Sequence, residues 1–282
     1  MKRGLVMEGG AMRGMFTCGV IDVLMECRIK VDGAAGVSAG AVFGCNIKSH
    51  QIGRPIRYNK KYSRDPRYCS FRSLLKTGDM FGAEFCYHTL PEVLDPFNKR
   101  IFKKNPMEFY IGATDVMTGR PVFHKCTDGG EKDIEWMRAS ASMPLVSRVV
   151  SIDGRKLLDG GVACPIPYRF LERRGYNRNL IVLTQPKGFV KKQVSMLPII
   201  KLALKDYPAL FRAMATRHLR YNAQINDIEN MEKWGNVVVI RPPESLEIGR
   251  TEKNPSELER VYEVGRIETL KKLDEIKDFF GM

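Results

Sequence analysis

The stretch that most constrains this chain is Gly36-Val37-Ser38-Ala39-Gly40, which has the pattern G-x-S-x-G. Small and apolar residues at 31–35 predict a strand before it, and residues 41–47 have the composition of a helix that begins after it. A serine at a sharp turn between a strand and a helix is the arrangement of a nucleophile elbow, in which a strained backbone exposes the hydroxyl. Gly36 and Gly40 let the helix pass close to the strand, because a Cβ there would collide. The alternative is a turn of small residues without chemistry.

The chain alternates between predicted strands and helices from its first residues onward. Residues 3–7 predict a strand, residues 8–14 a glycine-rich loop, and the apolar spacing after residue 14 a helix. Further strands are predicted at 108–116, 120–124, 148–152, 155–158, 179–184 and 236–241, and helices at 134–141, twice between 196 and 234, and at 255–280. Alternation of this kind favours an α/β fold with a mainly parallel sheet that is covered on both faces.

The length of 282 residues allows one large α/β domain or two small ones. We expect a catalytic core at 1–190 and a mostly helical region with one strand at 191–282, packed on that core. No apolar run approaches the roughly 20 residues that span a bilayer, and the first apolar run stops at Glu8, too early for a signal peptide. Seven cysteines without a C-x-x-C pair indicate reduced thiols rather than a zinc site or a disulfide framework. We therefore expect a cytoplasmic protein.

The net charge of +14 is spread unevenly along the chain. Residues 48–76 contain nine Lys and Arg and one acid, and residues 187–220 contain eight and one. Positive charge gathered in this way attracts polyanions, either nucleic acid or an anionic lipid surface. The alternative is a basic face that is only solvated.

The glycine-rich loop at 8–14 has three interpretations. A dinucleotide loop needs G-x-G-x-x-G, which is absent. A phosphate-binding loop matches the separation of Gly9 and Gly14, but Met15 stands where that motif has lysine. The third interpretation is an oxyanion hole. Backbone N–H groups that open a helix point together at the positive end of its dipole, and they can hold the negative oxygen that forms when a serine attacks a carbonyl.

A serine nucleophile needs a base, and the histidines at 50, 88, 124 and 218 offer few candidates. Only His218 follows Asp159, as the order Ser–Asp–His of the α/β-hydrolases requires. It lies in a basic helical segment without turn signals, so a surface histidine is the preferred interpretation. Asp159 follows a predicted strand, and Gly160 and Gly161 permit a sharp turn after it. An aspartate that acts alone must be close, oriented and partly desolvated to take a serine proton; the alternative is a plain turn.

Four blocks occur in order within residues 3–184: Glu8-Gly9-Gly10-Ala11-Met12-Arg13-Gly14, Gly36-Val37-Ser38-Ala39-Gly40, Ala139-Ser140-Ala141-Ser142-Met143-Pro144 and Asp159-Gly160-Gly161. Together they resemble the patatin-like phospholipase family, and its bacterial members in particular. That family has a glycine-rich oxyanion loop ending in Arg-Gly, a G-x-S-x-G nucleophile, an alanine/serine–proline block and a D-G-G or D-G-A acid. Residues 190–282 contain no motif that matches it.

The resemblance implies a three-layer α/β/α fold and a Ser–Asp dyad without histidine. Ser38 is then the nucleophile and Asp159 the base, with Gly160 and Gly161 forming the acid loop. The oxyanion loop implied by the resemblance consists of Gly9, Gly10, Ala11, Met12, Arg13 and Gly14, with N–H donors in its first three residues. The family loop commonly has a third glycine where this chain has Ala11, and alanine disfavours a positive φ.

The function that the resemblance implies is hydrolysis of lipid acyl esters, of the phospholipase A or lysophospholipase type, through an acyl-enzyme. This reaction requires no metal and no cofactor. The expected partner is a lipid or ester substrate, together with peripheral contact to an anionic membrane at its inner face, and no specific nucleic acid. The alternative is a catalytically silent protein that retains the fold and binds membranes or nucleic acid.

Overall fold

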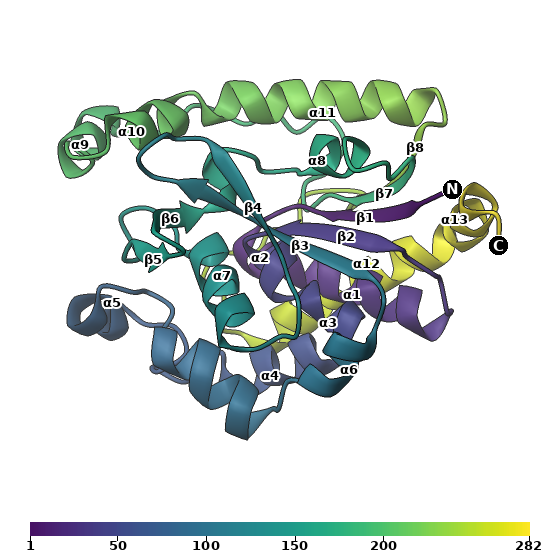
Figure 1. Ribbon diagram of the computed structural model, residues 1–282, viewed down its shortest axis with the longest axis horizontal. Helices are drawn as coiled ribbons and strands as arrows, with labels where there is room; N and C mark the ends of the chain where they lie inside the picture. Colours follow the sequence, from purple (N-terminus) through teal and green to yellow (C-terminus); the bar gives the residue numbers. More distant parts are fainter.

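An eight-stranded mixed sheet crosses the centre of the molecule in the order β5-β6-β3-β2-β1-β7-β8, with β4 paired to β3 (Figure 1). The computed structural model describes all residues from 1 to 282. The strands are β1 (Arg3–Met7), β2 (Gly33–Val37), β3 (Glu108–Asp115), β4 (Pro121–Lys125), β5 (Val150–Ile152), β6 (Arg155–Asp159), β7 (Arg178–Val182) and β8 (Val237–Ile240). Strands β1, β2, β3, β7 and β8 pair in parallel, whereas β4, β5 and β6 join the sheet through antiparallel pairs.

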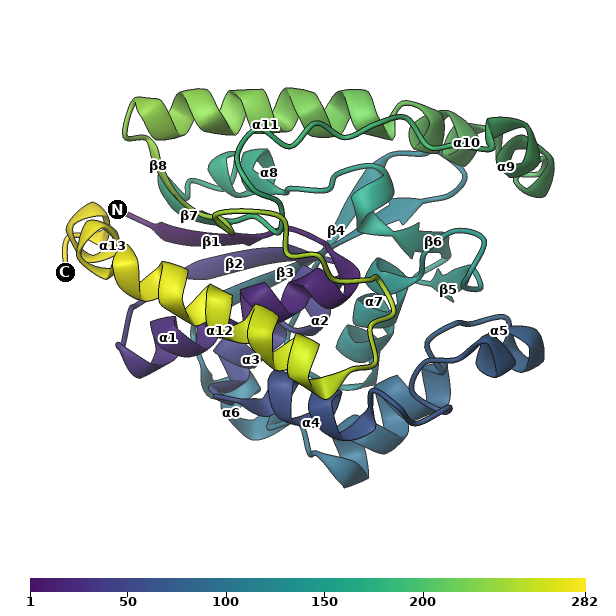
Figure 2. The same ribbon diagram turned by 180° about the vertical axis from the view of Figure 1, so that it is seen from behind.

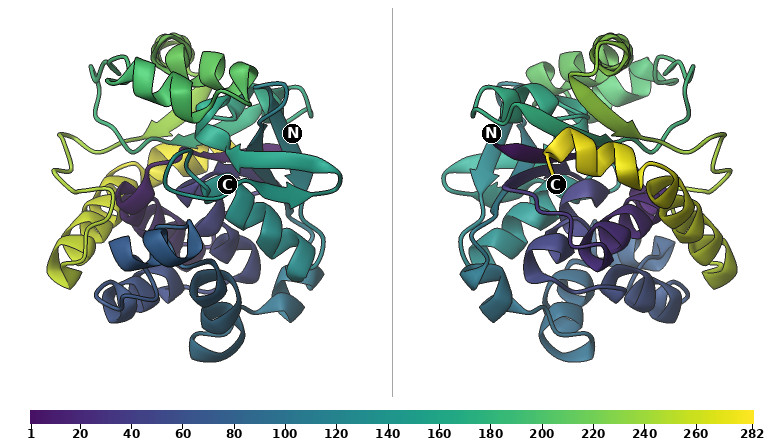
Figure 3. Two further views of the ribbon diagram at one scale, coloured as in Figure 1. Left: turned by 90° about the vertical axis from the view of Figure 1, so that its left-hand side faces the viewer. Right: turned by 90° about the vertical axis from the view of Figure 1, so that its right-hand side faces the viewer.

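Helices cover both faces of this sheet, as the views from behind and from the sides show (Figures 2 and 3). They are α1 (Gly14–Glu26), α2 (Ala39–Val42), α3 (Cys45–Ser49), α4 (Arg54–Tyr62), α5 (Phe71–Thr77), α6 (Lys99–Lys104), α7 (Glu131–Ala141), α8 (Tyr168–Glu172), α9 (Leu197–Ala203), α10 (Pro208–Ala215), α11 (Arg217–Lys233), α12 (Pro255–Lys271) and α13 (Leu273–Phe280). Three short elements of other helix types are η1 (Ala11–Arg13), η2 (Phe85–Leu94) and η3 (Gly160–Val162). The arrangement confirms the predicted three-layer α/β/α fold. No helix combines the length and the apolar composition needed to cross a membrane.

Alternate side chains of the central strand β1 pack into two separate hydrophobic cores, one on each face of the sheet. On β1, Leu5 and Met7 pack into a core of 47 buried residues on the side of α1 and α12, whereas Val6 packs into a smaller core of 13 on the side of α8 and α11. Successive side chains of a strand point to opposite faces, so a strand between two helical layers is apolar throughout. This is why residues 5–7 lack a polar position.

The C-terminal region is bound to the N-terminal half by the contact between α12 and α1. A Cβ added to Gly19 would lie 2.1 Å from the carbonyl oxygen of Tyr262, and one added to Gly265 would lie 2.1 Å from that of Phe16. The two helices can therefore approach this closely only because each carries a glycine at the crossing. The Tyr262 hydroxyl also donates a hydrogen bond to Asp22 at 2.8 Å. The helix that follows the glycine loop is thus held from the far end of the chain.

Two predictions about helices in this region are wrong in detail. Residues 196–234 form three helices rather than two. Pro198 and Pro208 lie in the first turns of α9 and α10, and a further break at Thr216 separates α10 from α11. The helix predicted at 255–280 is broken at Lys272. The break turns α13 onto β7 and β8, where Ile276 and Phe280 are buried. The single predicted strand is β8, which extends the central sheet beside β7; the boundary at residue 190 stays a prediction.

Candidate active site

Ser38 lies at the sharp turn between β2 and α2, in a backbone conformation that residues with side chains rarely adopt. Its φ is 55° and its ψ is −125°. A Cβ added to Gly36 would lie 2.2 Å from the carbonyl oxygen of Gly40, and one added to Gly40 would lie 2.4 Å from that of Met7. Both flanking glycines are therefore required for the strand and the helix to pass this closely. The geometry is that of a nucleophile elbow.

The register of β3 brings Ser38 and Asp159 together. Val37, the last residue of β2, pairs with Gly112, and the next residue, Ala113, pairs with Asp159 at the end of β6. Strand β4 occupies the opposite edge of β3 over these residues. Strands β2 and β6 therefore share one edge of β3, and β6 begins its pairing where β2 turns away. Residues 121 positions apart in sequence come to neighbouring positions in this way.

The carboxylate of Asp159 is almost completely buried, with 1% of the residue exposed. Its Oδ1 accepts a hydrogen bond from the N–H of Gly161 at 2.7 Å, whereas Oδ2 has no partner. Burial raises the pKa of Asp159, and the positive charge of Arg217, the nearby Ser38 hydroxyl and the Gly161 N–H oppose that rise. Because Oδ2 has no partner, it can accept the proton of the nearby Ser38 hydroxyl. A carboxylate with a raised pKa is a stronger base than one in water.

Ser140 connects the elbow to the sheet. The N–H of Ser38 donates to its Oγ at 2.8 Å, and that hydroxyl donates to the carbonyl of Gly112 at 2.6 Å. Two residues further on, the carbonyl of Ser142 accepts a hydrogen bond from the N–H of Asp159 at 2.8 Å. The alanine/serine block at the end of α7 therefore holds both members of the pair. The sequence singled out this block without assigning it a role.

The glycine-rich loop lies against the elbow. A Cβ added to Gly9 would be 2.9 Å from the Cβ of Ser38, and one added to Gly14 would be 2.8 Å from that of Ala39. The N–H groups of Gly9 and Gly10 donate no backbone hydrogen bond, so they are available to an oxygen at Ser38. Ala11 has a φ of 50°, in the left-handed region that costs a residue with a Cβ about 1–2 kcal/mol.

One end of this loop is held by Glu8, and the other end continues into α1. The buried carboxylate of Glu8 accepts hydrogen bonds from the N–H of Thr184 at 2.6 Å and from its hydroxyl at 3.2 Å. Met12 is buried, and η1 leads directly into α1 at Gly14. The Nε of Arg13 is buried without a hydrogen-bond partner. The loop is thus tied to β7 at one end and to the elbow at the other.

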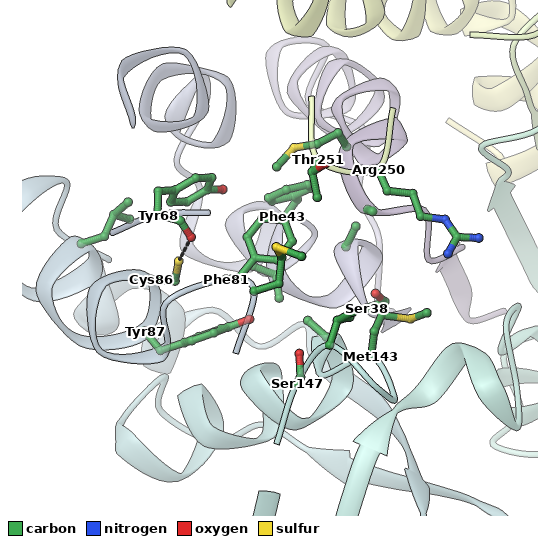
Figure 4. A pocket seen from close by; sticks show the side chains of 18 of the residues that line it. Ser38, Phe43, Tyr68, Phe81, Cys86, Tyr87, Met143, Ser147, Arg250 and Thr251 are labelled. Atoms are coloured by element: carbon green, nitrogen blue, oxygen red, sulfur yellow. Dashed lines mark hydrogen bonds between the residues drawn. The ribbon is translucent and has the colours of Figure 1, made fainter. Parts of the chain in front are cut away.

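A cavity of about 250 Å³ opens beside Ser38, and 15 of the 19 residues that line it are hydrophobic. In Figure 4 the aromatic side chains of Tyr68, Phe81 and Tyr87 lie on one side of Ser38, and the guanidinium of Arg250 lies on the other. The cavity therefore has an apolar part and a cationic end, with the serine hydroxyl between them. An apolar cavity with a few polar groups is the usual form of a ligand site.

None of the four histidines lines this cavity. His124 pairs with Asp133 at 2.7 Å and forms, with Cys126, the one group of three potential metal ligands within 4.8 Å of one another. The Asp133 carboxylate also accepts three backbone N–H groups, which leaves it little capacity for a metal ion. His218 lies on α11 with its Nδ1 buried and unpartnered. The charges that act on Asp159 come from arginines, not from a histidine.

Three cations near the site have no signal in the sequence motifs. Arg217 donates from Nε to the carbonyl of Gly161 at 2.6 Å, Arg250 lines the cavity, and Lys191 lies among them. All three come from the region after residue 190 and share no spacing with the four blocks. The positive charge of Lys191 and Arg217 was visible only as part of the basic composition of 187–220, and Arg250 lies outside that segment.

The basic segments differ in how their apolar residues are used. In the second segment Ile200 and Leu210 are buried, whereas Ile199 and Leu202 are exposed by 56% and 72%. Helix α5 in the first segment buries none of its residues. The apolar residues at 196–211 are therefore divided between core packing and the surface.

Comparison with known families gives two matches. The model described as Patatin-like phospholipase matches residues 5–171, which contain all four blocks. A second, described as a domain of unknown function (DUF6363), matches residues 207–281. The first covers more than half of the chain and includes Ser38 and Asp159; the second includes Arg217 and Arg250.

Curated relatives are similar over part of their length. Lysophospholipase nte1 of Aspergillus oryzae is 25% identical over 93% of this chain and 17% of that protein, and its counterpart in Aspergillus fumigatus is 30% identical over 56% and 10%. The uncharacterized protein YjjU of Escherichia coli is 28% identical over 64% of this chain and 52% of its own. The chain therefore spans between a tenth and about half of these relatives. VipD from Legionella pneumophila matches 97% of this chain and 67% of its own with a TM-score of 0.48 and 12% identity.

Proposed function

The chain belongs to the patatin-like phospholipase family, and we propose that it hydrolyses lipid acyl esters, as a phospholipase A or lysophospholipase, with Ser38 as nucleophile and Asp159 as base. The observation that carries this proposal is the register on β3, which sets the end of β6 beside the elbow. A serine in a strained turn, a buried carboxylate with a free oxygen and a loop with free N–H groups supply the three parts that acyl transfer needs.

The reaction proceeds through an acyl-enzyme. Asp159 takes the proton of Ser38 while Oγ attacks the ester carbonyl, and the N–H groups at 9–11 stabilise the resulting oxyanion. The tetrahedral intermediate collapses, the C–O bond to the alcohol breaks, and Asp159 returns the proton to the departing oxygen. A water molecule then gives its proton to Asp159, attacks the acyl group and releases the fatty acid, and the proton returns to Ser38.

The size of the cavity favours one acyl chain. Its volume of about 250 Å³ lies just below the roughly 300–1,000 Å³ usual for small-molecule sites, and its lining is mostly apolar. A single-chain lipid fits this space better than a lipid with two chains, which supports the lysophospholipase type of activity.

We also propose that the edge carrying α5 and α9 contacts an anionic lipid surface. Both helices stand at the edge of the molecule toward which the parallel strands point (Figures 1 and 2). Phe71 and Leu75 on α5 are exposed by 68% and 79%, and Leu202 on α9 by 72%. Arg72 and Lys76 lie among these side chains on α5, and Lys201 lies beside Leu202 on α9. Each Lys or Arg near an anionic membrane contributes about 1 kcal/mol.

Labelling with a fluorophosphonate probe tests the proposal, because only an activated serine reacts with it. Wild-type protein should become labelled and should hydrolyse soluble short-chain esters, and Ser38→Ala should do neither while its circular dichroism stays unchanged. Ser151→Ala, on an exposed strand away from the cavity, is the matched control and should label like the wild type. A wild-type protein that neither labels nor hydrolyses any ester of a lipid panel would instead be a silent protein with this fold.

A further inference from the structure

Four cationic side chains from separate parts of the chain meet beside the proposed dyad. They are Arg13 of the glycine loop, Lys191 of the segment after β7, Arg217 at the start of α11 and Arg250 of the loop before α12, and we call them the cationic cluster. Burial lowers the pKa of each of Arg13, Lys191 and Arg217, and the positive charge of neighbouring cluster members lowers it further. The carboxylates that act on the cluster are Glu8 and Asp159, so positive charge exceeds negative charge there.

The donors of the cluster are largely unused. None of its members forms an ion pair with a carboxylate. The guanidinium of Arg217 donates one hydrogen bond, from Nε to the carbonyl of Gly161. The Nε of Arg13 is buried without a hydrogen-bond partner. The Nζ of Lys191 lies 4.3 Å from the ring centre of Tyr221. Arg13, Lys191 and Arg217 are partly buried, whereas Arg250 is exposed at the mouth of the site. Positive charge that is partly shielded from water and has no counter-ion is costly, so the cluster is suited to an anion that arrives with the substrate.

The position of the cluster says which part of a substrate that anion belongs to. Arg250 stands at the end of the cavity opposite the aromatic side chains, with Ser38 between them (Figure 4). A lipid whose acyl chain fills the apolar part and whose ester carbonyl lies at Ser38 extends its head group towards Arg250. Arginine binds phosphate through paired, parallel N–H donors, and lysine adds a point charge.

We propose that the cationic cluster binds the phosphate of the substrate head group, and that the preferred substrates are acyl esters with a net anionic phosphate rather than neutral glycerides or zwitterionic lipids. The inference rests on the proposed function. The excess positive charge also disfavours a head group that carries its own ammonium, since like charges would then face each other. Three of the four cations lie outside the segment that matches the patatin-like phospholipase family.

Binding to the inactive Ser38→Ala protein tests the proposal independently of catalysis. The probes are three single-chain lipids with the same acyl group: a glycerol 3-phosphate, a glycerol and a glycerophosphocholine, each titrated below its micelle concentration by calorimetry. The phosphate lipid should bind at least tenfold more tightly than the other two. Because a hydrogen bond to a charged group is worth roughly tenfold in affinity or more, adding Lys191→Gln or Arg250→Gln should weaken its binding about tenfold.

Lys192→Gln is the matched control, since Lys192 is the exposed neighbour of Lys191, and it should leave all three affinities unchanged. Equal affinity for the phosphate lipid and the glycerol lipid, or equal losses for both in the variants, would overturn the proposal. Inorganic phosphate distinguishes the remaining source: if it binds as tightly as the phosphate lipid, the cluster is a site for free phosphate and not for a head group. Binding that follows the expected pattern in a protein without esterase activity would leave this inference standing while the proposed function fails.

The pH dependence of binding gives a second readout. Burial and the charge of Arg217 lower the pKa of Lys191 to about 8, and Glu8, Arg13 and Arg250 are the other charged groups that act on it. The neighbouring Tyr221 stays neutral because burial and Glu8 raise its pKa. Lys191 is therefore mostly protonated at pH 7 and loses its charge as the pH rises through 8. Affinity for the phosphate lipid should fall between pH 7 and 9.5, and Lys191→Gln should remove most of that fall.

Discussion

Two regions of the molecule meet at Ser38, and they are built in different ways. The motif blocks are residues 8–14, 36–40, 139–144 and 159–161, and backbone contacts and small side chains fix their geometry. The segment 187–250 reaches the same place with long cationic side chains carried on a loop, on α11 and on the loop before α12. The comparison teaches that the elbow and the glycine loop are shaped locally by residue size, whereas the charge around Ser38 depends on tertiary position.

The largest effect that this comparison predicts falls on the motif blocks. Asp159→Asn preserves the shape and removes the base, so the rate on a soluble ester should fall by about three to four orders of magnitude, as it does when a triad loses its acid. Each of the four histidine-to-alanine variants should keep its rate within a few-fold, as measured by steady-state kinetics. A histidine variant as inactive as Ser38→Ala, with its fold intact, would show that the chain uses a Ser–His pair.

A smaller loss is expected from Ser140→Ala, which keeps both proposed catalytic groups and removes their support. The N–H of Ser38 and the carbonyl of Gly112 lose a buried partner, which should lower the free energy of unfolding by about 1–3 kcal/mol and the rate about tenfold. Urea denaturation and ester kinetics measure the two effects. Ser142→Ala, whose hydroxyl bonds only the carbonyl of Arg138, should lower the rate less. Equal rate losses would mean that the block acts only through general stability.

Much of the fold could be predicted from the sequence, because turns and buried strands follow short-range rules. The pairing of Ser38 with Asp159 was implied only by the family resemblance, because the register of β3 that brings them together is a long-range feature. The glycines at 36 and 40 predict the nucleophile elbow, and the apolar runs predict the strands. The broken helix at Lys272 could not be predicted, since it bends to bury Ile276 and Phe280 against strands far away in sequence. The positions of the cationic side chains of the 187–250 segment could not be predicted either, because no local sequence pattern indicates which site an arginine on a helix contacts.

Variants of the edge proposed to contact a membrane test whether the 187–250 segment and the first basic segment both contribute to vesicle binding. Leu75→Asp and Leu202→Asp each remove an exposed apolar side chain that would enter the lipid interface. Burial of a leucine is worth about 1.5–3 kcal/mol, so sedimentation with anionic vesicles should show at least a tenfold loss of binding. Trp234→Asp, exposed by 75% at the far end of α11, is the matched control and should bind normally. Equal binding of the wild type to neutral and anionic vesicles at low salt would exclude the electrostatic part.

The pH profile of Arg217→Gln tests whether a charge of the 187–250 segment changes the pKa of the proposed base, Asp159. The positive charge of Arg217 opposes the rise in the pKa of Asp159, so its removal should raise that pKa further. Since the carboxylate must be ionised to act, the acidic limb of kcat/KM on a neutral ester should move to higher pH by about one unit, with a smaller change on the plateau. Arg212→Gln, exposed on α10, should leave the limb in place. An unmoved limb in Arg217→Gln would assign the limb to another group.

The smallest effect is expected where the motif blocks themselves depart from an unstrained backbone. Ala11 holds a φ of 50°, which costs about 1–2 kcal/mol relative to glycine, but glycine also stabilises the unfolded chain by about 0.4–1 kcal/mol. Ala11→Gly should therefore raise the free energy of unfolding by roughly 0–1.6 kcal/mol. Arg28 is an exposed residue with a φ of 55°, so Arg28→Gly should raise the free energy of unfolding by about as much. Urea denaturation of both variants therefore measures the cost of the positive φ separately from any effect of the active site.

The N–H of residue 11 is present with either side chain, so the rate of Ala11→Gly should stay within a few-fold of the wild type. A tenfold gain in kcat in Ala11→Gly, without one in Arg28→Gly, would mean that the Cβ of Ala11 displaces an N–H donor of the oxyanion hole. The residue sizes in the motif blocks would then not be those that give the highest rate.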